Sequence, residues 1–166
     1  MKISQASLIA IVMAVALVPA LATASPDSDV GFRGWGPRVG LSLDPDQVHF
    51  GAHLDYGQFA NHVRFQPNVE YGFGENWNLL TLNAEAAYRF NQNWDVWSPY
   101  LGGGLGVNIK SFDNDNHNNS ETDIGLNLLG GIEKGLANGD RFFIEGKLSL
   151  NDVPDVKITV GWTFYH

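Results

Sequence analysis

Ser42, His49 and Glu70 are the residues whose types and spacing come nearest to a catalytic set. A serine, a histidine and a carboxylate in line supply a nucleophile, a general base and a group that orients the base. If the intervening turns are tight, Ser42 lies opposite His49 on the next strand, and His49 lies opposite Glu70 on the strand after it. The chemistry would be acyl hydrolysis or transfer. Because no oxyanion donor is identifiable, we assign no catalytic residue and interpret the three side chains as parts of a polar network.

A second candidate site lies in the polar segment of residues 113–121. Its carboxylates Asp113, Asp115 and Glu121, separated by amide side chains, are oxygen ligands of the kind that Ca²⁺ and Mg²⁺ prefer. The EF-hand pattern fails, because the sixth position lacks glycine and Ile124 stands where a glutamate is required. We therefore interpret the segment as a hydrated loop and predict neither a metal site nor a cofactor.

The elements that position these residues are predicted to be strands. Stretches of alternating polar and apolar residues are separated by clusters of Gly, Pro, Asn and Asp, which close turns. No long segment has apolar residues at helical spacing, so the fold class is all-β. The predicted strands cover residues 37–43, 48–56, 63–73, 79–90, 99–110, 124–136, 141–150 and 156–165.

Alternation sorts the residues of each strand onto two faces. One face is apolar along nearly its whole length, with aromatic residues toward the strand ends. The other face carries many small residues and a balanced set of charges, which we predict to form a network inside a barrel. Its members are Arg38, Asp55, Arg64, Glu70, Glu85, Arg89, Glu133, Glu145, Lys147 and Lys157.

Two architectures share this alternation. A transmembrane barrel turns the apolar face outward and the polar face into its lumen. A soluble, lipocalin-like barrel does the reverse and binds an apolar ligand inside. Composition favours the membrane barrel, because a soluble exterior should be rich in Lys and Glu, whereas this polar face is mostly Gly, Asn, Ser and Thr. Balanced charges among small residues suit a narrow lumen, in which unpaired charge is costly.

The N-terminus has the features of a secretory signal peptide. Lys2 precedes an uninterrupted apolar run at residues 8–18, and small residues at 22 and 24 fit a cleavage site. We predict a signal peptide at residues 1–24, a periplasmic N-terminal segment at 25–34 and a barrel domain at 35–166. The chain has no cysteine, which excludes disulfides and thiolate chemistry. Its net charge of -8 argues against nucleic-acid binding.

The signal peptide, the eight amphipathic strands and two segments in particular resemble a known family, over essentially the whole mature chain. The final segment, residues 156–166, and the glycine-rich stretch PYLGGGLG at residues 99–106 look like those of the small outer-membrane β-barrel proteins of the OmpA/OmpX type. The resemblance implies an eight-stranded, antiparallel, up-and-down transmembrane β-barrel with both termini in the periplasm. It also implies insertion by the barrel-assembly machinery, which reads a last strand that typically ends in Phe. This chain adds Tyr165 and His166 after Phe164.

The resulting prediction is a non-enzymatic, monomeric protein in the outer membrane of a Gram-negative bacterium. It would support envelope integrity or surface interaction, with outer-membrane lipid and lipopolysaccharide as partners. Because its lumen should be filled by side chains, general porin activity is not expected. The alternatives are a periplasmic lipocalin-like barrel that binds an apolar ligand and an acyl hydrolase that modifies lipid A.

Overall fold

The computed structural model describes residues 29–43, 46–74, 77–92, 94–112, 119–150 and 155–165. The predicted signal peptide lies outside these residues, as do Asp113 and Asp115. Within the described residues the chain is all-β. Its strands are β1 (Asp29–Leu43), β2 (Asp46–Ala60), β3 (Val63–Phe65), β4 (Asn68–Phe73), β5 (Trp77–Arg89), β6 (Ser98–Phe112), β7 (Asn119–Gly135), β8 (Arg141–Leu150) and β9 (Asp155–Tyr165).

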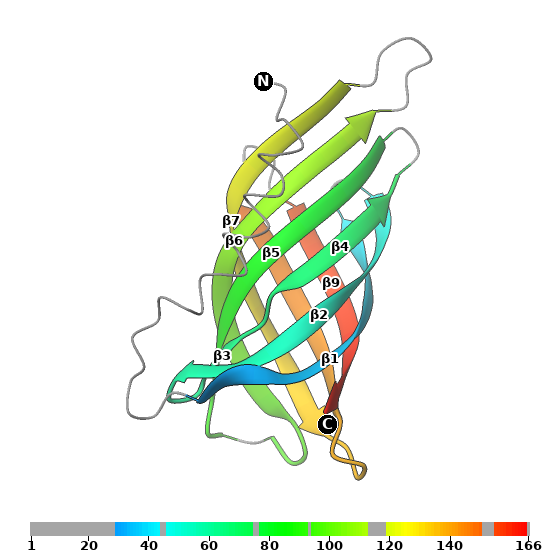
Figure 1. Cartoon of the computed structure of the whole chain (residues 1–166). Helices are drawn as coiled ribbons and strands as arrows, with labels where there is room; N and C mark the ends of the chain where they lie inside the picture. Colours follow the sequence, from blue (N-terminus) through cyan, green and yellow to red (C-terminus); the bar gives the residue numbers. More distant parts are fainter. Residues whose placement is uncertain are drawn as a thin grey trace.

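The strands close into a barrel (Figure 1). Apart from β3 and β4, which do not pair with each other, each strand pairs antiparallel with its neighbours in the chain, and β1 also pairs with β9, which closes the sheet. Both β3 and β4 lie between β2 and β5, so these two short strands share one position in the wall. The barrel therefore has eight strand positions, and the predicted fold is confirmed.

The interruption between β3 and β4 falls at Gln66 and Pro67, where we predicted one continuous strand over residues 63–73. Proline has no N–H to donate to a ladder, so it ends regular pairing. The wall stays connected because the Leu54 N–H donates to the Pro67 carbonyl at 2.9 Å and the Gln66 N–H donates to the Glu85 carbonyl at 2.8 Å.

Several strands are longer than predicted. β1 begins at Asp29, so residues 29–34 belong to a strand, although we had expected the barrel to begin at residue 35. β6 and β7 extend to Phe112 and from Asn119, whereas the sequence predicted a loop over residues 111–123. Lys110 lies opposite Glu121 in this extension. The polar composition of residues 111–123 had indicated a loop. A strand whose two faces both meet water can be polar as well, so composition does not separate the two.

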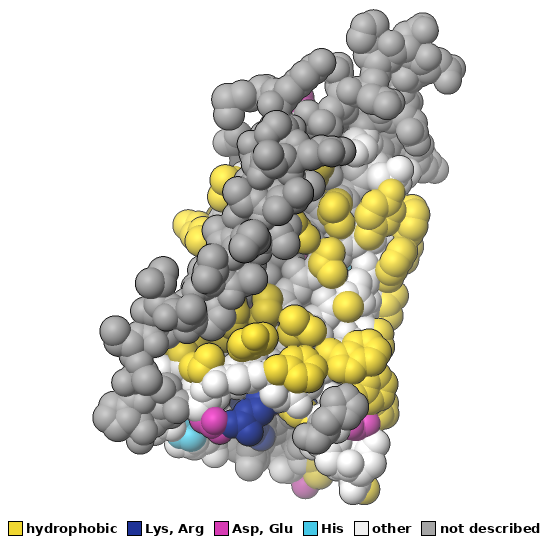
Figure 2. All heavy atoms as spheres, in the orientation of Figure 1, with side chains coloured by type: hydrophobic (Ala, Val, Ile, Leu, Met, Phe, Trp, Pro, Cys, Tyr) yellow, Lys and Arg dark blue, Asp and Glu magenta, His cyan; other side chains and the backbone are white. Residues whose placement is uncertain are grey.

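The two faces of the sheet have the predicted polarity. The exposed large hydrophobic residues lie along the outer face of the strands, as Figure 2 shows for one side of the barrel. The interior is lined mainly by buried polar and charged side chains. A lipocalin-like barrel needs an apolar interior, so that alternative is wrong. Among the described residues, no helix is long and apolar enough to cross a membrane.

Aromatic side chains form groups near both ends of the outer surface. Phe50, Tyr71 and Phe73 group near the end where β4 finishes: the rings of Phe50 and Phe73 stack with their centroids 5.3 Å apart, and Tyr71 meets Phe73 edge to face at 4.7 Å. Trp35 and Phe164 pack edge to face at 5.7 Å near the opposite end. Two aromatic belts bounding an apolar band are the arrangement that membrane–water interfaces favour.

Candidate functional site in the barrel lumen

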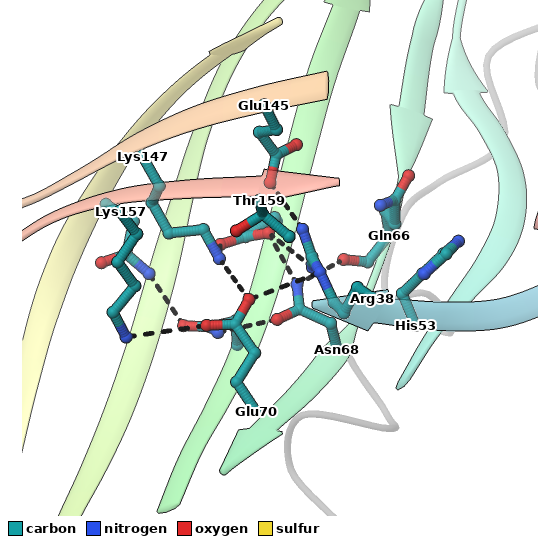
Figure 3. A network of polar contacts seen from close by, with 12 residues as sticks. Arg38, His53, Gln66, Asn68, Glu70, Glu145, Lys147, Lys157 and Thr159 are labelled. Carbon is teal, nitrogen blue, oxygen red and sulfur yellow. Dashed lines mark hydrogen bonds and ion pairs between the residues drawn. The ribbon is translucent and has the colours of Figure 1, made fainter. Parts of the chain in front are cut away.

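A cluster of buried charges fills the middle of the lumen, and we call it the central cluster (Figure 3). Its cations and carboxylates are balanced in number, and they project from β1, β4, β5, β8 and β9. Its members are Arg38, Glu70, Glu85, Glu145, Lys147 and Lys157.

Arg38 is the hub of the central cluster. Arg38 lies on β1, and its side chain is fully buried. The guanidinium Nη2 donates to Glu145 Oε1 at 2.6 Å, its Nε lies 3.4 Å from Glu70 Oε1, and its Nη1 lies 3.9 Å from Glu85 Oε2. One guanidinium therefore interacts with carboxylates from β4, β5 and β8, which ties distant parts of the wall together through the interior.

Two lysines complete the pairing of these carboxylates. Lys147 Nζ lies 2.7 Å from Glu85 Oε1 and 3.1 Å from Glu70 Oε1. Lys157 Nζ lies 3.6 Å from Glu70 Oε2. Because desolvated charges are stable only when well paired, this balance is what allows so many ions to occupy a closed interior.

A chain of amide hydrogen bonds extends the network across β4, β5 and β7. Asn127 donates to Asn83 Oδ1 at 2.8 Å, Asn83 donates to Asn68 Oδ1 at 2.8 Å, and Asn68 donates to Glu85 Oε2 at 2.6 Å. The Asn83 and Asn68 amides both accept and donate, so a continuous polar path runs from Asn127 to the Glu85 carboxylate.

A small apolar cluster separates the central cluster from the end of the barrel where β1 begins. It consists of Ala87, Tyr100, Leu129 and Phe143. The Phe143 ring centroid lies 5.6 Å from the Arg38 guanidinium carbon and 5.9 Å from that of Arg141. The Tyr100 hydroxyl donates to Glu145 Oε2 at 3.0 Å. These side chains form a plug between two charged layers.

The second charged layer, which we call the mouth cluster, lies on the other side of the plug. It comprises Asp55, Arg64, Arg89, Glu133 and Arg141. Glu133 Oε2 accepts from Arg64 Nη1 at 2.8 Å and lies 3.5 Å from Arg141 Nη1, while Arg89 Nε lies 3.2 Å from Glu133 Oε1. Arg141 Nη1 also donates to Asp55 Oδ2 at 3.2 Å.

The mouth cluster borders a cavity of about 550 Å³ at this end of the barrel. We call the cavity the vestibule. The Tyr165 hydroxyl, from the end of β9, also lines it and donates to Asp55 Oδ2 at 2.8 Å. The vestibule is thus a polar chamber lined mainly by charged and polar side chains.

The structure brings the residues of the predicted lumen network together, but as two layers rather than one. Arg89 differs from the rest: its side chain is 54% exposed at the mouth, although it still pairs with Glu133. Sequence reasoning missed Arg141 and the interior ring of Phe143. A signal for both was present, because positions 141 and 143 are in phase with Glu145 and Lys147 along β8.

The predicted alignment of Ser42, His49 and Glu70 is wrong. In both the β1–β2 and the β2–β4 pairing, the register differs from the predicted one by two residues. Ser42 lies opposite Gln47, while His49 lies opposite Gly40 on one neighbour and Gly72 on the other. His49 Nε2 hydrogen-bonds Thr159 Oγ1 at 3.0 Å, and Glu70 pairs with the cations of the central cluster. The three side chains are buried in the lumen but do not form the predicted line.

The metal candidates are only partly covered by the structure. Glu121 is exposed on β7, whereas Asp113 and Asp115 lie outside the described residues. Among the described residues, no three His, Asp or Glu side chains are grouped so that they could hold a metal ion.

An apolar outer band with aromatic belts and a lumen of paired charges define the class: a small transmembrane β-barrel with a filled interior. No family model matches the chain, and no curated protein matches it. Solved structures are similar in fold. Neisserial surface protein A has 17% identity and a TM-score of 0.64, covering 81% of this chain and 96% of that one.

Two further structures show the same architecture. The N-terminal β-barrel domain of Pseudomonas aeruginosa OprF has 12% identity and a TM-score of 0.61, covering 81% of this chain and 99% of that domain. The outer-membrane enzyme PagL has 14% identity and a TM-score of 0.50, covering 80% of this chain and 99% of its own. The resemblance to small outer-membrane barrels predicted from the sequence is therefore confirmed at the level of the fold.

Proposed function

We propose that this chain is an integral protein of the outer membrane of a Gram-negative bacterium, exported by a cleaved signal peptide. Its role is structural: it supports the envelope and presents the ends of its strands to the surface. The observation that carries this proposal is the polarity of the barrel, apolar outside and charge-balanced inside. Lipid contact stabilises such an outer face, whereas water does not.

The outer face of the barrel and the ends of its strands indicate which partners we propose. The apolar band contacts outer-membrane lipid, and the far ends of β6 and β7 approach lipopolysaccharide. The barrel-assembly machinery would recognise β9 during insertion. We also propose a monomer, because the sheet formed by the described strands is closed and has no open edge at which a second copy could pair.

Membrane fractionation followed by a gel-mobility test checks the localisation and the fold together. We expect the protein in the outer-membrane fraction, with one band in unheated SDS and a shifted band after boiling, because a closed barrel resists SDS until heated. A protein that remains in the periplasmic extract without detergent would contradict the proposal.

We propose a non-enzymatic role, and the register of the lumen supports it, since Ser42 does not face His49 across the β1–β2 ladder. PagL, an enzyme of similar fold, makes a direct assay necessary. We expect the mass of lipid A to be unchanged in cells that overproduce this chain. Loss or gain of an acyl chain would show that the barrel is an enzyme.

A further inference from the structure

The connection between β5 and β6 exposes two apolar side chains at its tip. Trp94 is 62% exposed and Val96 is 58% exposed. The Trp94 N–H donates to the Trp97 carbonyl at 2.7 Å, and the Trp97 N–H donates to the Trp94 carbonyl at 3.1 Å. These reciprocal hydrogen bonds close a two-residue turn in which Asp95 has a positive φ of 60°. We call residues 94–97 the tryptophan turn.

One stem of the tryptophan turn lies against the outside of the barrel wall. The Trp97 ring centroid lies 6.2 Å from that of Phe142 on β8, and Lys134 Nζ on β7 lies 5.4 Å from the Trp97 centroid. Lys134 and Phe142 are cross-strand partners, and Phe142 is in phase with the exposed Ile144 on the outer face. The turn therefore reaches past β7 to β8 on the lipid-facing side. It is not part of the described lining of the vestibule.

The tryptophan turn continues the aromatic belt at this end of the barrel. Neighbouring ring centroids are 5.7–6.4 Å apart along a run of five aromatic side chains: Trp35, Phe164, Trp162, Phe142 and Trp97. At the other stem, Tyr88 and Phe90 of β5 pack edge to face at 5.2 Å. Both stems of the turn therefore join aromatic groups on the outer face.

The charged groups near the tryptophan turn match a layer of lipid headgroups. Lys134 carries its ammonium group on a long apolar stem, so the ammonium can reach lipid phosphates while the stem contacts apolar neighbours. Asp95 is exposed at the tip, and its carboxylate needs water. A headgroup layer supplies water, phosphate and the first part of the acyl chains, and tryptophan is enriched there. The hydrocarbon core supplies no polar contacts, so the turn fits the interface and not the bilayer interior.

We propose that the tryptophan turn is an interfacial anchor that binds phospholipid at the end of the barrel where β1 begins. Trp94 and Val96 insert between the lipids, and Lys134 lies at the level of their phosphates. This inference rests on the proposed membrane location of the barrel. Insertion removes the two exposed side chains from water, which favours this position of the turn. The contact of Trp97 with Phe142 favours lipid over other partners, because it holds the turn against the lipid-facing wall.

Site-specific fluorescence in liposomes tests the anchor, since the chain has no native cysteine. Val96→Cys is labelled in urea with an environment-sensitive fluorophore and refolded into liposomes of phosphatidylethanolamine and phosphatidylglycerol. Iodide on both sides of the membrane reports contact with water, and a nitroxide in the lipid headgroup region reports contact with lipid. Ala137→Cys, exposed on the turn between β7 and β8 at the same end, is the matched control. We expect the nitroxide to quench the Val96→Cys probe, and iodide to quench it several-fold less than the Ala137→Cys probe.

Trp94→Gln in the Val96→Cys chain tests whether the exposed indole holds the turn in the lipid. The hydrogen bonds that close the turn remain, because they involve only main-chain atoms of Trp94. Iodide quenching should rise to that of the Ala137→Cys probe, and nitroxide quenching should fall. Unchanged quenching by both agents would overturn the role of Trp94 as an anchor.

A third probe separates the anchor from the proposed membrane location. Leu105, on β6, is 56% exposed on the outer face, so the label on Leu105→Cys should be quenched by a nitroxide placed deep in the acyl chains. No quenching of this probe would overturn the membrane location and the anchor together. Quenching of Leu105→Cys by lipid, with equal iodide quenching of the Val96→Cys and Ala137→Cys probes, would overturn the anchor alone. The turn would then project into water, free to bind a protein or a glycan.

Discussion

At the scale of single residues, Arg38 has the largest predicted effect on stability. It is buried against Glu70, Glu85 and Glu145, so Arg38→Met leaves three carboxylates with two lysines in a closed interior. Removing one partner of a buried ion pair typically costs about 3–5 kcal/mol. We expect a loss of this size in the free energy of unfolding, measured by urea titration in detergent micelles.

Arg33→Met on the same strand is the control for Arg38→Met. Arg33 is half-exposed, and among the described residues its ion pair is with Asp29, a pair of the kind that contributes roughly 0–1 kcal/mol. Equal urea midpoints for the two variants would show that the lumen pairing does not stabilise the barrel.

The limits of sequence reasoning are also visible at single residues. Period-two alternation placed Glu70, Glu85 and Glu145 in the lumen, because a buried face fixes which residues point inward. The pairing of Ser42 with His49 was wrong because a shift of two residues keeps every side chain on its own face. The register of the β1–β2 pairing depends on the length of the turn after Leu43. The alternation of polar and apolar residues gives no information about that length.

At the scale of elements, the contact between β8 and β9 depends on Gly161. Phe143 lies opposite it, and a Cβ added at Gly161 would approach the Phe143 ring to 2.3 Å. The ring is 1% exposed and cannot move without displacing its packed neighbours. Gly161→Ala should therefore lower the free energy of unfolding by about 1–3 kcal/mol, the usual cost of overpacking, as measured by urea titration.

Gly135→Ala at the end of β7 provides the comparison, because a Cβ there has nothing within 4 Å. Its unfolding midpoint should match the wild type. If Gly161→Ala is also neutral, the lumen has more free space around Phe143 than its burial indicates.

Strand identities were easier to predict than strand interruptions. Residues 64, 66, 68 and 70 all face the interior, so alternation continues straight through Pro67. Pro67 itself was the signal for the break between β3 and β4, because it cannot donate to the ladder. Side-chain patterning reports the face on which a residue lies, whereas backbone chemistry decides where the ladder is interrupted.

At the scale of the whole molecule, the orientation of the barrel is testable because the chain has no native cysteine. We expect Glu121→Cys, on the exposed far part of β7, to react with a membrane-impermeant maleimide on intact cells. Gln92→Cys, between β5 and β6 at the opposite end, should react only after the outer membrane is permeabilised. The reverse pattern would invert the proposed topology.

Because side chains fill the lumen, we expect the whole barrel to block the passage of small solutes. Two obstacles lie in series: the plug formed with Phe143, and the central cluster around Arg38. Removing the plug by Phe143→Ala leaves the ion pairs intact, so neither the wild type nor this variant should admit small sugars in a liposome-swelling assay. A general porin reconstituted in parallel supplies the positive control. Swelling by the wild type would mean that the ion pairs open in the bilayer, whereas swelling by Phe143→Ala alone would identify the aromatic plug as the only barrier.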